Sequence, residues 1–417
     1  MMPSTRQRVC ALAAAALALC GLLAVVPGDS QPSPGAVQVQ VTGSPAPVAT
    51  LRLAIVTTVR ALLPDARNAD ITLTGTTPPL GDLPFSSRTA VQAAILITPP
   101  AGPAVLRVLP VALTNVILPW SDAQTLLVSN SPETLPFGKV LFNSVLAATQ
   151  TMRLLYHHQN GSKAQHMFIT VALSNPNRTP LTLWVSGAQS DTGGDELTLG
   201  HAAARRFLEA YWAHAGFLLQ IPANTTLSLF VHDLAPLAIG SGLAQLQVVD
   251  GDRLNLQVVA RLASETEPPT SSFASDFDRE HQRGEFTRPQ IARALSYTAG
   301  GPPAVMALGA DADLLGEATT GERLQGNYGV MYSFEVQLAN PTPAPAAVVL
   351  MMHAAGGRAR GTFLVGGQIV DGPVVQANAP QVLATLRLAP GTRRRLRIAT
   401  MPESGSNYPV RLTLGAP

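Results

Sequence analysis

Short apolar runs separated by proline and glycine fill this chain from residue 36 onward. The first of them are residues 37–42, 50–62, 71–74, 89–98, 104–118 and 125–129. Runs of this length with turn residues between them are typical of strands in β-sandwiches. The stretch 51–60 also fits helical spacing, so a helix there is the alternative. The pattern predicts a mainly β protein of tandem immunoglobulin-like β-sandwich domains.

Two strand-like stretches far apart in the chain carry matching text. They read V-A-L-S-N-P at 171–176 and V-Q-L-A-N-P at 336–341, and an apolar run follows each. Alternate side chains of such a strand face one core, and proline ends the ladder because it has no N–H to donate. We expect two related β-domains in which these two strands occupy equivalent places.

One segment departs from the strand pattern. Residues 199–215 place Ala204, Phe207, Leu208 and Tyr211 at helical spacing, and Gly216 is suited to end a helix. We predict one amphipathic helix here, packed on the sheets or linking them.

The distribution of apolar residues predicts the domain boundaries. A β-sandwich-like domain over 36–150 precedes a β-domain with the inserted helix over 151–263, and the two form either one unit or two. Apolar residues become sparse over 264–289, which is typical of a linker. A second β-sandwich domain is expected over 290–417.

The N-terminus has the pattern of an export signal. Arg6 and Arg8 precede an apolar run over 9–26, so we interpret residues 1–30 as a signal peptide, leaving no transmembrane span after its removal. The expected location is the periplasm, the cell surface or the medium of a bacterium. Both cysteines, Cys10 and Cys20, lie inside this segment, which excludes cysteine catalysis in the exported chain.

Charge and composition exclude several classes of partner and cofactor. The formal charge is +2, and it falls to zero without Arg6 and Arg8, so no overall field attracts nucleic acid. Short motifs for nucleotide binding, zinc proteases and serine hydrolases are absent. We therefore expect no cofactor and no nucleic-acid partner.

Histidines provide the leading candidate site. If Asn160 and Gly161 form a two-residue hairpin turn, His157 and His166 become diagonal neighbours on one face. Together with His201 on the predicted helix they could bind a metal or a small ligand. The alternative is ordinary hydrogen-bonded histidines, because two ligands from one hairpin make a loose metal site.

A second candidate is a basic stripe near the C-terminus. In a strand, Arg393, Arg395 and Arg397 share one outer face, while Arg394 points inward with Leu396. The stripe could contact an anionic envelope polymer, or it could be a solvated face.

Taken together, these features favour a secreted or envelope-associated structural or interaction protein without catalytic activity. Envelope polymers or other surface proteins are its expected partners. An exported small-ligand or metal-binding protein that uses the histidines is the first alternative. A hydrolase of envelope polymers is the second, because paired catalytic carboxylates leave no local motif.

Overall fold

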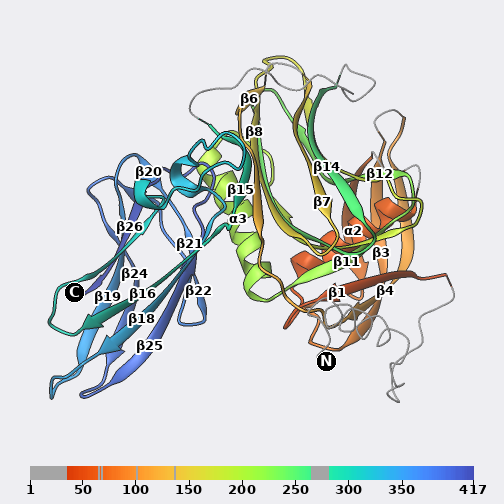
Figure 1. The fold of residues 1–417 in the computed structure, drawn as a ribbon. Helices are drawn as coiled ribbons and strands as arrows, with labels where there is room; N and C mark the ends of the chain where they lie inside the picture. The colour runs from red at the N-terminus through yellow and green to blue at the C-terminus, as the bar shows by residue number, and fades with distance from the viewer. Residues whose placement is uncertain (1–34, 64–65, 67–68, 100–101, 136–137, 264–280) are drawn as a thin grey trace, which may run out of the picture.

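The computed structural model describes residues 35–63, 66, 69–99, 102–135, 138–263 and 281–417 (Figure 1). The predicted signal peptide and both cysteines lie outside the described residues. So does most of the predicted linker, namely residues 264–280. The last part of the predicted linker contains strand β15 (Arg283–Thr287).

The N-terminal part is a helix packed beside a sheet. Its elements are β1 (Val37–Thr42), α2 (Val48–Leu62), β2 (Asp70–Thr77), β3 (Arg88–Thr98) and β4 (Val105–Asn115). The run at 50–62 is thus a helix, and its buried residues Leu51, Ala54, Ile55 and Val59 lie on one face at helical spacing. Strand β1 pairs with β11 (Gly216–Ile221), so the strands of this part continue the same large sheet as β11.

Eight strands within the described residues form a sandwich in the middle of the chain. They are β7 (Lys139–Ala147), β8 (Thr151–Asn160), β9 (Met167–Asn175), β10 (Leu181–Gln189), β11, β12 (Thr225–Leu234), β13 (Ile239–Asp250) and β14 (Arg253–Leu262). One sheet has the order β12-β9-β14-β7, and the facing sheet contains β8-β13-β10-β11. Strand β5 (Thr125–Ser129) adds to β8 in parallel, β15 pairs with β5, and the short β6 (Thr134–Leu135) also pairs with β8. Residues 36–150 and 151–263 therefore share both sheets.

The C-terminal sandwich repeats this strand order. Its main strands are β16 (Gln290–Thr298), β17 (Ala304–Leu308), β18 (Met331–Ala339), β19 (Ala346–Ala354), β21 (Thr362–Val365), β22 (Gln368–Asp371), β24 (Gln381–Leu388), β25 (Arg393–Thr400) and β26 (Val410–Gly415). One sheet is β17-β26-β19-β24, and the other is β16-β18-β25-β21-β22, with β16 parallel to β18. The short β20 (Arg358–Ala359) and β23 (Val375–Gln376) pair with each other.

This order corrects the expected immunoglobulin-like topology. When the eight antiparallel strands of either sandwich are numbered along the chain, strands 1, 8, 3 and 6 form one sheet and 2, 7, 4 and 5 form the other. That is a jelly-roll order, whereas the first two strands of an immunoglobulin domain are neighbours in one sheet. Strand periodicity predicts strands and their buried faces but not their partners, so it could not distinguish the two topologies.

The predicted hairpin at Asn160-Gly161 is wrong for the same reason. Strand β8 belongs to the large sheet and β9 to the facing one, so the chain crosses between layers at this turn. Asp250-Gly251 likewise connects β13 to β14 across the sandwich. Asn-Gly and Asp-Gly favour tight turns, but a tight turn can also lead to the opposite sheet.

Three buried asparagines hold the crossing turns in the same way. Asn160, Asn175 and Asn340 each direct Nδ2 at three backbone carbonyls at 2.8–3.1 Å, and Oδ1 accepts the N–H of the residue two positions on. Two of the three carbonyls are consecutive: they belong to the last residue of another strand and to the residue that follows it. The asparagine therefore ties two turns together and satisfies buried carbonyls that a ladder cannot reach.

These contacts correct the expected equivalence of the two text repeats. Asn340 directly follows β18, the second strand of its jelly roll, and binds the carbonyls of Leu388 and Ala389 at the end of strand six. Its counterpart is Asn160, which ends β8 and binds Leu234 and Ala235 after strand six of the first jelly roll. Asn175 ends strand three instead. The two domains are related in topology, but the similar text is offset by one strand.

Helix α3 (Glu196–Trp212) is the predicted amphipathic helix, inserted between β10 and β11. One side packs on β10 and β13 of the first jelly roll, and another faces β21 of the second (Figure 1). Phe207 and Leu208 join one apolar cluster that also contains Leu155 and Leu243 of the first sandwich and the core of the second. The helix is therefore buried between two domains.

A buried cation also links the helix to both domains. The side chain of Arg153 on β8 is fully buried; Nη1 donates to the carbonyl of Gly329 at 2.9 Å and Nη2 to Gln245 Oε1 at 3.2 Å. Its guanidinium lies 5.7 and 5.4 Å from the ring centres of Phe207 and Tyr211. Such cation–π contacts stabilise a charge that has lost its water.

Within the described part of the chain, no helix is long and apolar enough to span a membrane.

Replacing Asn340 with alanine tests the role of the buried asparagines. The substitution leaves several buried carbonyls without a donor, and we expect the free energy of unfolding to fall by about 2–4 kcal/mol. Urea unfolding measures this loss. Asn143 is exposed on β7, and Asn143→Ala is the matched control with an expected change within about 0.5 kcal/mol. Equal effects of the two substitutions would contradict the assignment.

Candidate functional site

A polar cavity lies where the two jelly rolls meet at the start of α3. Its volume is about 240 Å³. The first jelly roll contributes Glu133 and His157, and α3 contributes Glu196. The opposite wall comes from the C-terminal domain, chiefly Tyr328 and residues 404–409, and His281 lies ahead of β15. We call this space the junction cavity.

Three potential ligand groups converge in the junction cavity. One oxygen of Glu133, one ring nitrogen of His157 and one oxygen of Glu196 all lie within 4.8 Å of one another. Glu133 lies just before β6, His157 is on β8 and Glu196 is the first residue of α3. Pairing of β6 with β8 brings the first two together, and packing of α3 on the sheet brings the third.

His157 is the unusual member of this group. The residue is 1% exposed, and neither Nδ1 nor Nε2 has a hydrogen-bond partner in the structure. Burial of an imidazole without partners is costly, so such a ring needs an explanation, for example a bound ion or water. Glu133 differs, because its Oε2 lies 2.8 Å from His281 Nε2.

The pKa values of the two carboxylates in the cavity are shifted in opposite directions. Burial alone would raise the pKa of Glu133, but the hydrogen bond from His281 and the nearby His157 lower it below its ordinary value. Burial, followed by repulsion from Glu133, raises the pKa of Glu196. Burial also lowers the pKa of His157, which keeps its ring neutral at pH 7. A neutral imidazole beside carboxylates is the form that coordinates a metal.

Two glycines allow the backbone of the C-terminal domain to pack closely against α3 beside the cavity. A Cβ on Gly200 of α3 would lie 1.9 Å from the carbonyl oxygen of Ser404, and one on Gly405 would lie 2.3 Å from the carbonyl oxygen of Glu196. Gly405 also has a φ of 74°, which disfavours any side chain. Backbone therefore packs directly on backbone beside Glu196.

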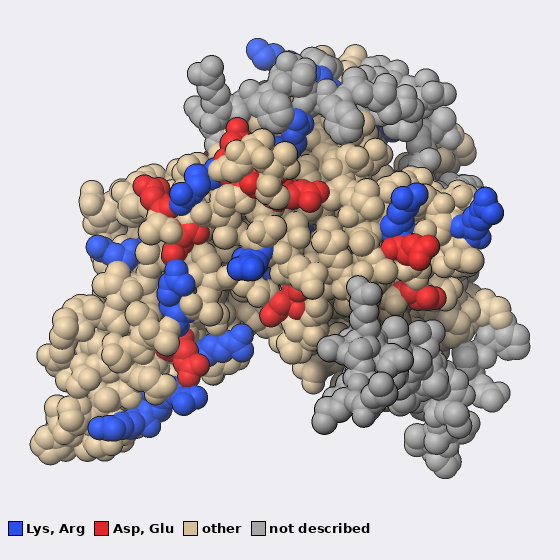
Figure 2. All heavy atoms as spheres, viewed as in Figure 1, with Lys and Arg blue, Asp and Glu red and all other residues tan. Residues whose placement is uncertain are grey.

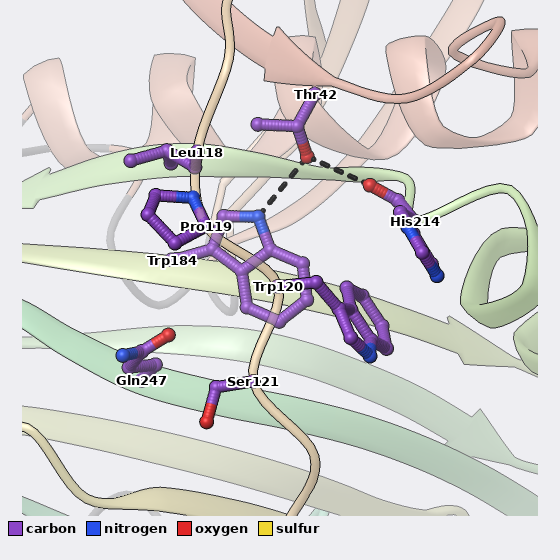
Figure 3. Close-up of a pocket in the computed structure, with 8 residues that line it drawn as sticks. All are labelled: Thr42, Leu118, Pro119, Trp120, Ser121, Trp184, His214 and Gln247. Atoms are coloured by element: carbon purple, nitrogen blue, oxygen red, sulfur yellow. Dashed lines mark hydrogen bonds between the residues drawn. The ribbon is translucent and has the colours of Figure 1, made fainter.

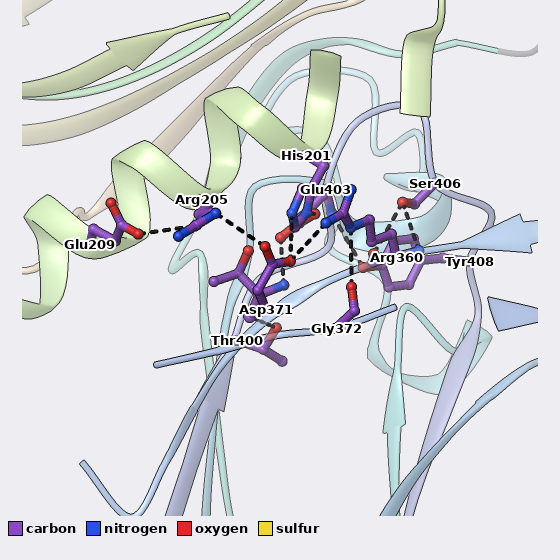
Figure 4. Close-up of polar contacts among 11 residues, drawn as sticks. His201, Arg205, Glu209, Arg360, Asp371, Gly372, Thr400, Glu403, Ser406 and Tyr408 are labelled. Carbon is purple, nitrogen blue, oxygen red and sulfur yellow. Dashed lines mark hydrogen bonds and ion pairs between the residues drawn. The ribbon is translucent and has the colours of Figure 1, made fainter. Parts of the chain in front are cut away.

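His201 belongs to a separate cluster, one turn further along α3 (Figure 4). Its Nδ1 lies 2.6 Å from Oε2 of the fully buried Glu403, whose Oε1 accepts the N–H of Thr362 at 2.7 Å. Its Nε2 lies 2.9 Å from Asp371 Oδ1 without the alignment of a hydrogen bond. Burial raises the pKa of Glu403, although His201 opposes that shift. We call His201, Asp371 and Glu403 the helix latch.

The structure does not bring the predicted histidine trio together. His166 is half exposed, and its Nδ1 lies 2.7 Å from Asp233 Oδ1. His157 lines the junction cavity and His201 belongs to the latch. Because β8 and β9 lie in different sheets, the diagonal pairing of His157 with His166 does not form.

The predicted arginine stripe lies on strand β25. Arg393, Arg395 and Arg397 are exposed, and Arg395 Nη1 lies 3.3 Å from Glu335 Oε1. Arg394 is exposed as well, which corrects its expected inward direction. Figure 2 shows basic side chains in a line across the C-terminal domain with acidic ones between them. The line is thus a mixed rather than a purely basic surface.

A small hollow beneath β1 is a packing feature (Figure 3). Its volume is about 10 Å³, which holds no more than one water. Trp184 Nε1 donates to Thr42 Oγ1 at 3.1 Å, and Trp120 stacks on the ring of His214 at 4.6 Å. These contacts fix the C-terminal end of α3 against the sheet.

Comparisons with known proteins identify no family. No protein-family model and no curated protein matches the sequence. Among solved structures, Lac15 from a marine microbial metagenome is 11% identical with a TM-score of 0.13, and 91% of this chain aligns with 96% of that one. The tandem CBM22 domains of Paenibacillus barcinonensis Xyn10C are 10% identical with a TM-score of 0.15, and 68% of this chain aligns with 91% of theirs. Similarity at these scores assigns neither fold nor activity.

Sequence reasoning missed Glu133, Glu196 and His281. They are separated from one another by more than sixty residues, and no spacing rule connects them. The one signal that pointed to the cavity was His157, selected for a different partner. Asp195 and Glu196 at the helix start are also ordinary residues for a first helical turn.

Disrupting the helix latch should destabilise the protein strongly. Glu403→Ala leaves His201 and the N–H of Thr362 without their buried partner, and we expect a loss of about 3–5 kcal/mol in the free energy of unfolding. Glu209, which forms an exposed i,i+4 pair with Arg205, provides the control. Glu209→Ala should cost about 0.5 kcal/mol or less. A loss below 1 kcal/mol for Glu403→Ala would show that the latch is not structural.

A buried histidine should make stability depend on pH. Burial lowers the pKa of His232 to about 4 from 6.5, and its Nε2 pairs with the hydroxyl of Tyr156 at 2.9 Å. The contribution of the neutral ring is therefore fully present above pH 6.5 and is lost as the pH falls toward 4, by roughly 3 kcal/mol. Urea unfolding between pH 7 and pH 4 measures this slope. His232→Gln cannot take up a proton and should make the slope shallower, and the remaining slope comes from other buried histidines such as His158; an unchanged slope contradicts the assignment.

Proposed function

We propose that the chain is an exported, envelope-associated binding protein whose ligand is a small polar molecule or ion in the junction cavity. The main observation that supports this proposal is that Glu133, His157 and Glu196, which come from three separate parts of the chain, converge in one polar space. A purely structural protein needs no such convergence. This proposal therefore places the first alternative of the sequence analysis ahead of a structural role.

The size and composition of the cavity define the class of ligand. Its volume of about 240 Å³ lies just below the range of about 300–1,000 Å³ for drug-sized ligands, so only a small molecule or an ion fits. The carboxylates of Glu133 and Glu196 and the imidazole of His157 line it, so recognition would rest on hydrogen bonds and charge. An apolar ligand would leave these groups without partners.

A hydrolase is the second candidate, supported by one specific observation. Glu133 and Glu196 approach within 4.8 Å, the pKa of Glu196 is raised and that of Glu133 is lowered. Retaining glycosidases use one protonated and one ionised carboxyl group about 5 Å apart. The neutral His157 between them and the small cavity favour binding over polymer cleavage.

Thermal unfolding with a panel of ligands tests the binding proposal. We expect at least one compound among hexoses, amino acids, dicarboxylic acids and divalent chlorides to raise the melting temperature by several degrees at saturation. Gln325 is exposed at the wall of the cavity, and Gln325→Trp should remove the shift by filling the space. Gln92 is exposed on β3, outside the cavity, and Gln92→Trp is the matched control.

Two outcomes would reject the proposal. Either no compound shifts the melting temperature, or the shift is equal in both tryptophan variants. Release of 4-nitrophenol from a chromogenic glycoside, abolished by Glu133→Gln, would instead favour the hydrolase.

A further inference from the structure

We propose that Glu133, His157 and Glu196 bind a divalent transition-metal ion, with Zn²⁺ the best fit, at the floor of the junction cavity. This inference rests on the proposed binding function and names the ligand of that site. It departs from the sequence-based expectation of no cofactor, because that expectation considered only His157 and His166.

The ligand set matches the chemistry of an intermediate metal ion. One imidazole nitrogen and two carboxylate oxygens are donors that Zn²⁺ accepts, and Ca²⁺ and Mg²⁺ prefer oxygen alone. The two carboxylates supply two negative charges for a divalent cation. Three protein ligands leave a fourth position open toward the cavity, where water or an anionic group could bind.

His157 gives the argument its independent support. Clusters of carboxylates often occur without an ion, because charged groups keep a surface soluble. Solubility does not explain the ring of His157, which is buried and has no partner for either nitrogen. Coordination of one nitrogen would satisfy it. Its position on β8, between paired strands, also holds the ring in place and so reduces the ordering that binding requires.

Small side-chain movements would complete the coordination shell. The three donor atoms lie within 4.8 Å, whereas donors around a tetrahedral Zn²⁺ lie about 3.3 Å apart. Glu196 is exposed, and rotation of its side chain can close the difference. Glu133 is held 2.8 Å from His281, which could orient its carboxylate as an outer partner of the ion.

The ion would also connect the elements of the junction. Glu133 and His157 belong to the first jelly roll, and Glu196 begins the helix against which Gly405 of the second jelly roll packs. Metal binding should therefore hold the start of α3 against the first jelly roll and reduce local opening there. Limited proteolysis provides a readout of that effect that is independent of the metal itself.

Titration of the chelator-treated full-length protein with ZnCl₂ by calorimetry tests the inference. We expect one ion per chain, no comparable binding of CaCl₂ or MgCl₂, and slower proteolysis with Zn²⁺. Glu196→Gln is isosteric at an exposed position and should weaken Zn²⁺ binding by at least about tenfold. His157→Asn should do the same, and the visible absorption bands of bound Co²⁺ should change in both variants.

His166→Ala is the matched control, because His166 is an exposed histidine outside the cavity. Its affinity for Zn²⁺ should equal that of the unsubstituted protein. Absence of Zn²⁺ binding, unchanged affinity in Glu196→Gln, or an equal loss in His166→Ala would each overturn the inference. If an organic compound still stabilises the protein in the presence of EDTA, and Gln325→Trp abolishes that effect, the proposed function stands although the metal inference fails.

Discussion

Burial of helix α3 between two β-sheets is the constraint on which the rest of the structure depends. The helix is inserted in the first jelly roll, yet its apolar side chains Phe207 and Leu208 belong to a cluster that continues into the core of the second. Hydrophobic burial is non-directional, so polar contacts set the orientation of the helix. Arg153 lies against the rings of Phe207 and Tyr211, and Glu403 pairs with His201. Each is a buried ionisable group that is stable in only a few positions, so these contacts fix how the helix is placed.

The same packing creates the junction cavity. The two domains meet closely where Gly200 and Gly405 remove side chains from the contact, and the space beside this contact is lined with polar groups. Water can enter this space and hydrogen-bond to its polar side chains, so burying them there costs less free energy than burying them in a dry interface. These side chains therefore remain available to bind a ligand. The latch and the cavity lie on successive turns of one helix.

The two jelly rolls share much of the remaining architecture. Both jelly rolls have the same strand order, a further strand paired in parallel with strand two, and an asparagine that joins the ends of strands two and six. Leu-Ala-Pro follows strand six in both, at 234–236 and 388–390. The domains diverge between strands four and five, where the first carries α3 and the second only the tight turn between β21 and β22. The inserted helix thus supplies the contact between two otherwise similar units.

The sequence by itself determined the local features: mainly β structure, the helix near 199–215, the strands at 37–42 and 125–129, and the exposure of Arg393, Arg395 and Arg397. These follow from periodicity, which each segment carries alone. Strand order, the crossing turn at Asn160 and the meeting of Glu133, His157 and Glu196 were decided only by tertiary structure. The physical reason is that pairing between strands and packing of a helix on a sheet depend on partners distant in the chain, and no local spacing encodes which partner is chosen.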